Sequence, residues 1–382
     1  MVGIGRAKGV RRGPNPPDLN KTIQTLKPKP TNRMLRLGFV PLTDCAPLVM
    51  AQELGLFKKA GLRVTLSREL GWATIRDKIV SGELDGAHAL GAMVLGTTLG
   101  LNCRPTPCLT AFVLNLNGNG ITLSEGLWNS GVRDAITLRE EIVRARPGRV
   151  YVLGVVYPHS SHRIHLIEWL RAAGIHPDRD VRIVVVPPPQ LFRNLAAGTI
   201  DGYCAGDPWN SLAVREKLGW TVATSHDLSP GHPEKVLMVR SVFAEQRHPE
   251  HLALVRALHE AARLCDEPTF RPELARLLAR REYLNVPERV IAAGLVGPYL
   301  HGHGRSSDAT DFILFHRQNA NDPTSARARW LLDDFSRAGL VPGGVGSLPS
   351  DLGSRIFRSD LFHQALQRHT STHHDEVHAS LV

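Results

Sequence analysis

Residues 34–66 read MLRLGFVPLTDCAPLVMAQELGLFKKAGLRVTL, a succession that predicts a strand, a helix and a second strand. Residues 34–41 alternate apolar with other side chains and end at a proline, which is typical of a strand that leads into a loop. A helix over 45–59 gathers Leu48, Leu54 and Phe57 on one apolar stripe, and Gly61 ends it. A short strand over 62–66 completes the unit.

The alternation continues with a predicted helix over 72–81 and a third buried strand over 86–90. Strands that alternate with helices favour a mostly parallel sheet with helices on its faces. A second unit of the same kind begins after the glycine-rich segment 118–120. Its predicted strands cover 150–156, 181–186, 202–205 and 220–224, and its predicted helices cover 160–173 and 191–198.

The C-terminal part of the chain turns helical, over residues 252–265, 272–282 and 325–338, and we expect these helices to pack back on the first unit. With 382 residues, of which 42% are hydrophobic, the chain is too large for one core. We therefore predict two lobes. The predicted division is a disordered basic tail over 1–33, a first lobe from 34–117 plus 230–345, a second lobe from 118–229, and a flexible extension over 346–382.

The net charge of +10 is concentrated at the N-terminus. Residues 1–34 carry eight Lys and Arg against Asp18 alone, a net +7, so the rest of the chain carries only +3. Such a basic, Pro-rich stretch could touch RNA, an acidic partner or a membrane surface, but its composition is that of a solvated extension. We therefore expect no direct binding of nucleic acid.

Several features of the sequence indicate the compartment. No apolar run of the roughly 7–15 residues that a secretory signal needs follows Arg11-Arg12, and no stretch reaches the ~18 apolar residues of a membrane span. The five cysteines form no CxxC pair, which argues against disulfides and a zinc ribbon. We predict a cytoplasmic protein; a signal sequence upstream of this start would make it periplasmic instead.

Residues with chemical potential follow the predicted strands, where ligands of open α/β sheets bind. Trp72 opens one helix, His162 opens another, and Asn119 lies in the glycine-rich crossing. Two helix N-termini that face one cleft form an anion site without a metal. Each residue also has a plainer interpretation: a packing tryptophan, a capping histidine, a turn asparagine and, for Lys235 beside Glu234, a solvated ion pair.

Eight motifs that occur in order resemble the nitrate- and bicarbonate-binding protein family of NrtA, CmpA and the cytosolic nitrate sensor NasS. The resemblance covers about residues 35–339. The motifs are GFVPLTDCAP (38–47), GWATIRD (71–77), DGAH (85–88), LNGNGIT (116–122), PHSSH (158–162), VPPPQ (186–190), YCAGDPW (203–209) and HPEK (232–235).

The resemblance implies a two-lobe type II periplasmic-binding-protein fold, with hinge crossovers and an anion in the cleft between the lobes. It also implies that the pocket residues are Trp72, Asn119, His162, Pro188 and Lys235. Asn119 replaces the glutamine common in nitrate transport proteins and leaves the pocket size open. In the bicarbonate binders, the position of Lys235 resembles an acidic residue that is used with calcium. A lysine at this position therefore favours nitrate or nitrite, because the site then offers charge and donors without an acceptor.

Three functions remain open at this point. A cytosolic sensor would control a regulator, by resemblance an RNA-binding antiterminator of the NasT type; the alternative is the substrate-binding subunit of an ABC-type transporter, with a permease as its partner. An enzyme would need Cys204, His162 and Asp207 as a nucleophilic trio, but a thiol on an apolar strand is by default buried and inert. We predict no cofactor. His374 and His378 have a metal-capable spacing, but we favour the interpretation of this segment as a polar tail.

Overall fold

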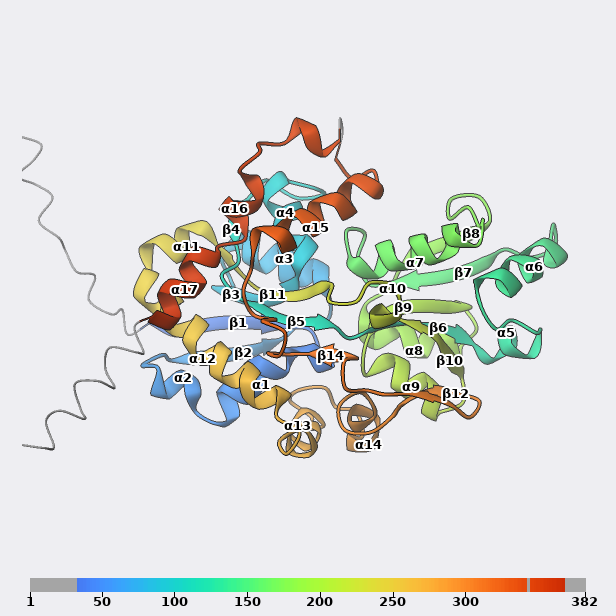
Figure 1. Ribbon diagram of the computed structural model, residues 1–382, viewed down its shortest axis with the longest axis horizontal. Coiled ribbons are helices and arrows are strands. Elements are labelled where there is room, and N and C mark those ends of the chain that lie inside the picture. Colours follow the sequence, from blue (N-terminus) through green and yellow to red (C-terminus); the bar gives the residue numbers. More distant parts are fainter. Residues whose placement is uncertain (1–32, 342–343, 368–382) are drawn as a thin grey trace, which may run out of the picture. The chain divides into compact units, whose positions relative to one another are not determined.

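The computed structural model describes residues 33–341 and 344–367 (Figure 1). The first of its two large sheets is seven-stranded. Its strand order is β14-β5-β11-β3-β1-β2, with β4 paired to β11. Strands β2, β1 and β3 run parallel, whereas β11, β5 and β14 add antiparallel pairs. The strands are β1 Leu35–Phe39, β2 Val64–Arg68, β3 Gly86–Leu90, β4 Cys108–Leu109, β5 Val113–Asn117, β11 Pro233–Arg240 and β14 Ile313–Leu314.

Helices cover both faces of the first sheet: Figure 1 shows α3, α4 and α15 above it and α1 and α12 below it. The helices and 3-10 turns of this part are η2 Thr43–Cys45, α1 Ala46–Glu53, α2 Leu56–Lys59, α3 Trp72–Ser81, α4 Gly91–Leu99, α11 Ser241–Gln246, α12 His248–Asp266, α13 Arg271–Leu278, α14 Glu288–Ile291, η3 Ala292–Gly294, α15 Ser325–Arg337, η4 Val345–Ser347, α16 Leu352–Ile356 and α17 Ser359–Gln367.

The second sheet is five-stranded, in the order β10-β6-β9-β7-β8. Strands β8, β7 and β9 run parallel, and β6 and β10 are antiparallel to their neighbours. Helix α7 lies above this sheet in Figure 1, and α8 and α9 lie below it. Its elements are β6 Asn119–Ser124, α5 Glu125–Asn129, α6 Ala135–Ala145, β7 Tyr151–Val155, α7 Ser161–Ala172, β8 Val181–Val185, α8 Pro188–Ala196, β9 Gly202–Gly206, α9 Trp209–Arg215, β10 Gly219–Thr224 and α10 Ser225–Leu228.

The chain crosses between the sheets at the predicted glycine-rich segment. Strand β5 ends at Asn117 and β6 begins at Asn119, so Gly118 alone separates a strand of the first sheet from a strand of the second. Asn117 and Gly118 both have positive φ, 59° and 93°, a conformation that asparagine and glycine tolerate best. The return runs from β10 through α10 into β11, which lies beside β5.

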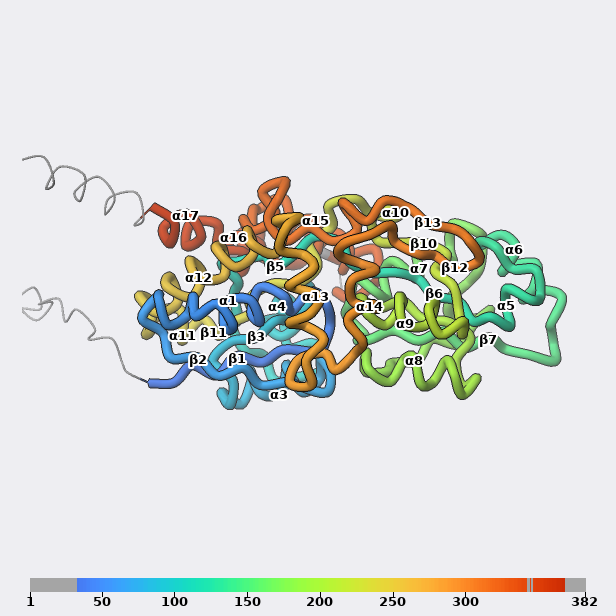
Figure 2. Tube along the Cα trace, turned by 90° about the horizontal axis from the view of Figure 1, so that it is seen from below, coloured from blue at the N-terminus to red at the C-terminus, as the bar shows by residue number. Residues whose placement is uncertain are grey.

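The chain connects the two sheets a third time, through a hairpin that the sequence does not predict. The hairpin of β12 Tyr299–Gly302 and β13 Arg305–Ser307 packs against β10 and α9 of the second sheet, as Figure 2 shows, before the chain returns to β14 in the first sheet. His301 Nδ1 lies 3.2 Å from the carbonyl oxygen of Thr221 in β10. The segment 230–345, predicted to lie wholly with the first lobe, therefore contributes a hairpin to the second sheet.

Other differences from the predicted elements have local causes. The helix predicted over 45–59 is interrupted because Gly55 adopts a left-handed φ of 65° between α1 and α2. The sheets are mixed rather than mostly parallel, because the crossings bring β11 and β6 into the sheets in the opposite direction. The extension over 346–382, predicted to be flexible, contains α16 and α17, and α17 buries Leu361 and Phe362.

Parts of the predicted tails lie outside the described residues. The basic segment 1–33, apart from Arg33, lies outside the described residues. So do His374 and His378, which have the metal-capable spacing. The remaining boundaries of the predicted lobes stay a prediction.

Candidate functional site

Lys235 lies at the centre of a buried polar cluster. It stands on β11, between Leu90 of β3 and Asn115 of β5, and its side chain is fully buried. Its Nζ lies 2.8 Å from Asp44 Oδ2 and 2.8 Å from Glu234 Oε1. The interpretation of Lys235 and Glu234 as a solvated surface pair is therefore wrong.

Asp44 and Trp72 complete the side of the cluster that the first sheet provides. Asp44 belongs to η2, which follows β1, and its Oδ1 accepts a hydrogen bond from His88 Nε2 at 2.7 Å. Trp72 is the first residue of α3; its ring packs 5.3 Å from the His88 ring and 5.6 Å from Lys235 Nζ. The indole Nε1 is buried and has no hydrogen-bond partner.

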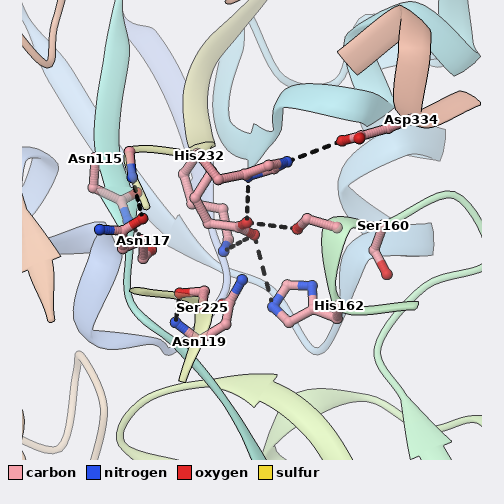
Figure 3. Close-up of polar contacts among 12 residues, drawn as sticks. Asn115, Asn117, Asn119, Ser160, His162, Ser225, His232 and Asp334 are labelled. Carbon is pink, nitrogen blue, oxygen red and sulfur yellow. Dashed lines mark hydrogen bonds and ion pairs between the residues drawn. The ribbon is translucent and has the colours of Figure 1, made fainter. Parts of the chain in front are cut away.

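The other side of the cluster comes from the second sheet. Ser161 and His162 are the first two residues of α7; Ser161 Oγ donates to Glu234 Oε2 at 2.5 Å, and His162 Nε2 lies 3.7 Å from Glu234 Oε1. Figure 3 shows His162, His232 and Asn119 approaching one region from separate segments of the chain. His162 is fully buried, and neither of its ring nitrogens has a hydrogen-bond partner.

Asn119 is held by its backbone rather than by its side chain. Its N–H donates to Ser225 Oγ at 3.1 Å, whereas its buried Oδ1 and Nδ2 have no partner. A Cβ added to Gly206, on the neighbouring strand β9, would lie 3.4 Å from both Asn119 Oδ1 and Asp44 Oδ2. Asn119 and the carboxylate of Asp44 therefore flank the same glycine, which joins the two sides of the cluster.

Pro188 is the first residue of α8, and its link to the cluster is indirect. The neighbouring Pro187 would touch a Cβ added to Gly71, at 3.4 Å, and Gly71 is the N-cap of α3. The structure thus brings Trp72, Asn119, His162 and Lys235 together. It brings Pro188 only to the adjoining helix start.

Five polar residues of the cluster are absent from the predicted site. They all lie within motifs that carry the family resemblance: Asp44, His88, Ser161, His232 and Glu234. The prediction that the site offers no acceptor is wrong, because two carboxylates flank Lys235. A signal was present in the sequence: a Glu next to a Lys inside an ordered motif.

The charges of the cluster compensate one another. Burial raises the pKa of Asp44 and of Glu234, but attraction by Lys235 and nearby histidines outweighs it, so both pKa values are lowered. Burial lowers the pKa of Lys235, yet Asp44 and Glu234 raise it above its ordinary value. All three groups are therefore ionised at neutral pH.

The histidines of the cluster differ in charge. Burial is the main influence that lowers the pKa of His162, to about 4, with attraction by Glu234 opposing it. Burial also lowers the pKa of His232, but Asp334, 3.0 Å from its Nε2, and Glu234 raise that pKa to about 9. His232 is a cation at neutral pH and His162 is neutral.

The nucleophilic trio finds no support in this geometry. Cys204 lies on β9, packs in the core of the second sheet and is 1% exposed. Burial raises the pKa of its thiol, which is the opposite of activation. Within residues 33–341 and 344–367 no group of three His, Cys, Asp or Glu is placed to hold a metal ion. Over the same residues, no helix has the length and apolar character to cross a bilayer.

Comparisons with known proteins agree with the motifs. Residues 28–279 match the model of the NMT1-like family. The chain is 40% identical, over 334 residues, to the nitrate import ATP-binding protein NrtC of Synechocystis; the match covers 87% of this chain and 49% of NrtC, so the chain spans about half the length of that relative. It is 33% identical to the nitrate/nitrite binding protein NrtA of Synechococcus elongatus, over 88% of this chain and 78% of NrtA.

Among solved structures, the crystal structure of the periplasmic nitrate-binding protein NrtA from Synechocystis PCC 6803 superposes with a TM-score of 0.83 at 30% identity, and covers 88% of each chain. This likeness confirms the predicted two-lobe periplasmic-binding-protein fold. Two of these three relatives are named as binding proteins. The chain therefore belongs to the NMT1-like family and, within it, to the nitrate- and bicarbonate-binding proteins related to NrtA.

Proposed function

We propose that this chain binds a small singly charged oxyanion, nitrate or nitrite, in the buried cluster around Lys235, without transforming it. The observation that carries the proposal is a set of unpartnered polar atoms: Trp72 Nε1, both amide atoms of Asn119 and both ring nitrogens of His162. Buried polar groups are nearly always hydrogen-bonded, so several unpartnered groups in one place favour a binding site for a polar ligand.

The chemistry of these atoms suits nitrate. The carboxylate oxygens of Glu234 and Asp44 already face Lys235, Ser161 and His88, so the uncommitted groups include three N–H donors, at Trp72 Nε1, Asn119 Nδ2 and one nitrogen of the neutral His162 ring. Nitrate accepts hydrogen bonds and donates none. Bicarbonate also needs an acceptor, and Asn119 Oδ1 is one, which makes bicarbonate the competitor that an assay has to include.

Ligand access requires movement. Trp72, Asn119, His162 and Lys235 are at most 1% exposed, so an ion from solvent reaches them only when the elements of the second sheet separate from those of the first. Closure around the ligand would then re-form the backbone hydrogen bond from Thr43 N to the Asp207 carbonyl, now 2.8 Å long.

The test is calorimetric titration of the full chain with nitrate, nitrite, bicarbonate and sulfate. We expect binding of nitrate or nitrite, and a loss of about 30-fold in affinity in Asn119→Ala, because a hydrogen bond to a charged group contributes about 2 kcal/mol. Asn129→Ala, at an exposed position of α5, is the matched control and should bind as the parent does. Binding of bicarbonate alone would contradict the choice of ligand.

The role of a bound anion is a second question. Similarity to NrtA and to the ATP-binding protein NrtC favours the substrate-binding component of an ABC-type importer, with a permease as partner. The competing proposal is a cytoplasmic sensor whose lobe closure is read by a NasT-like antiterminator. Fractionation of the native protein and a pull-down with and without nitrate separate the two: capture of a permease from the cell envelope supports transport, and nitrate-dependent capture of a soluble regulator supports sensing.

A further inference from the structure

The charge of Lys235 is already balanced before any anion arrives, and this is the starting point of an inference that rests on the proposed function. Lys235 lies 2.8 Å from each of two carboxylates, Asp44 and Glu234. The second cation of the cluster, His232, lies 3.6 Å from Glu234 and 3.0 Å from Asp334. Asp334 is also paired with Arg337, so the three carboxylates face three cations and leave no spare positive charge.

A further anion would therefore enter a buried environment without net positive charge. Transfer of an uncompensated charge into such a site is unfavourable, and the penalty grows where carboxylates stand close by. Either the unpartnered N–H groups of Trp72 and Asn119 suffice, or another group becomes positively charged when the anion binds.

His162 is the group placed to become charged. It is fully buried at the start of α7, both of its nitrogens are unpartnered, and its Nε2 lies 3.7 Å from Glu234 Oε1. His88, by contrast, has both nitrogens engaged: Nδ1 accepts from Val40 N at 3.4 Å and Nε2 donates to Asp44. The His162 ring thus has a free position for a proton and a second one for an anion.

The surroundings of His162 set the direction of the effect. The groups that face it are Glu234 and Lys235 of β11, Asp44 of η2 and His232, and on its own helix His165, whose ring packs 4.8 Å from that of His232. Burial is the main reason that the pKa of His162 is low, about 4, so the ring is neutral in the free protein. An anion in contact with the ring removes that penalty and favours the imidazolium.

We propose that the anion is bound together with one proton, held on the imidazole of His162, and that this single chargeable group restricts the site to singly charged oxyanions. A dianion such as sulfate would leave one negative charge without a counter-charge. From pH about 4 up to the pKa of His162 in the complex, affinity then falls about tenfold for each unit by which the pH rises.

Isothermal titration of the full chain with nitrate tests this, at a series of pH values and in buffers with low and high heats of ionisation. The dependence of the observed heat on the buffer gives the protons taken up, and we expect about one per nitrate near neutral pH. In His162→Asn, which keeps an N–H donor but cannot be charged, nitrate should bind more weakly, without proton uptake and with a flat pH profile. His165→Asn, one turn further along α7, should keep the proton uptake.

Each outcome bears on the inference. Nitrate binding without proton uptake, or uptake that persists in His162→Asn and disappears in His165→Asn, would overturn it. If His162→Asn does not fold, the parent protein labelled with 15N-histidine decides, since saturation with nitrate should convert one imidazole to imidazolium, and no conversion would refute the inference. The absence of binding by nitrate, nitrite and bicarbonate overturns the proposed function itself, and the inference with it.

Discussion

The substitution Glu234→Gln should tighten anion binding while it weakens the fold. Glu234 is one of the two carboxylates that neutralise Lys235, and it lies 3.7 Å from His162, the proposed contact of the anion. A glutamine keeps the shape and an oxygen that accepts from Ser161. It removes one negative charge from the immediate surroundings of the bound ion.

The size of both effects follows from the geometry. An anion that contacts the far nitrogen of His162 would stand about 8 Å from the Glu234 carboxylate, and at an effective dielectric constant of about 20 the repulsion is about 2 kcal/mol. Partial compensation by Lys235 and His232 reduces this repulsion, so we expect nitrate affinity to rise about tenfold. Stability should fall by about 3 kcal/mol, because one member of a buried ion-pair network is lost.

Calorimetry for affinity and urea denaturation for stability measure the two effects on the same preparation. Glu260→Gln on α12 is the matched control, since Glu260 is half exposed and pairs with Arg263 at the surface; it should change neither quantity. The variant should also bind nitrate with less proton uptake, because Lys235 is then free to balance the anion. Unchanged or weaker affinity in a folded Glu234→Gln protein would refute the charge argument.

Three further predictions test the cluster. Lys235→Met should abolish nitrate binding and destabilise the fold by about 3 to 5 kcal/mol, because Asp44 and Glu234 would lose their shared cation; Lys59→Met, at an exposed position, should do neither. Gly206→Ala should reduce nitrate affinity about tenfold with little change in melting temperature, since its φ is ordinary and the new Cβ would lie 3.4 Å from Asn119 Oδ1 and Asp44 Oδ2. The charge of His232 should contribute its full stabilisation below pH about 6.5. The free energy of unfolding should then fall by about 3 kcal/mol as the pH rises to about 9, where His232 loses its proton in the folded state, and His232→Asn should flatten that dependence.

The regular elements were predictable where one period dominates the sequence. The helix over 72–81 and the strand over 86–90 match α3 and β3, because an apolar stripe and a short buried run leave little ambiguity. Strand β11 was missed, since residues 233–235 read Pro-Glu-Lys and such charged residues are normally exposed. This stretch can be buried only because other segments of the chain supply partners for its charged side chains.

The candidate site was predictable in its location and not in its electrostatics. The resemblance named Trp72, Asn119, His162 and Lys235, which the structure brings together. That Lys235 faces Asp44, and that Ser161 and His162 face Glu234, depends on how two sheets meet, which no local pattern encodes. The hairpin over 299–307 eluded prediction for the same reason, because its partner Trp220 lies in another part of the chain.

That hairpin has a consequence for protein engineering. Residues 119–232 enter and leave the first sheet on adjacent strands, β5 and β11, so they resemble a cassette that could be excised or exchanged between relatives. Such a cassette would, however, lack the hairpin over 299–307 that covers Trp220. Tyr299 is fully buried, a Cβ on Gly302 would lie 3.1 Å from the Trp220 side chain, and the Arg305 guanidinium lies 5.4 Å from the Trp220 ring. A chimera that transplants 119–232 alone should expose Trp220 and aggregate, whereas one that also carries residues 299–307 from the same parent should not aggregate.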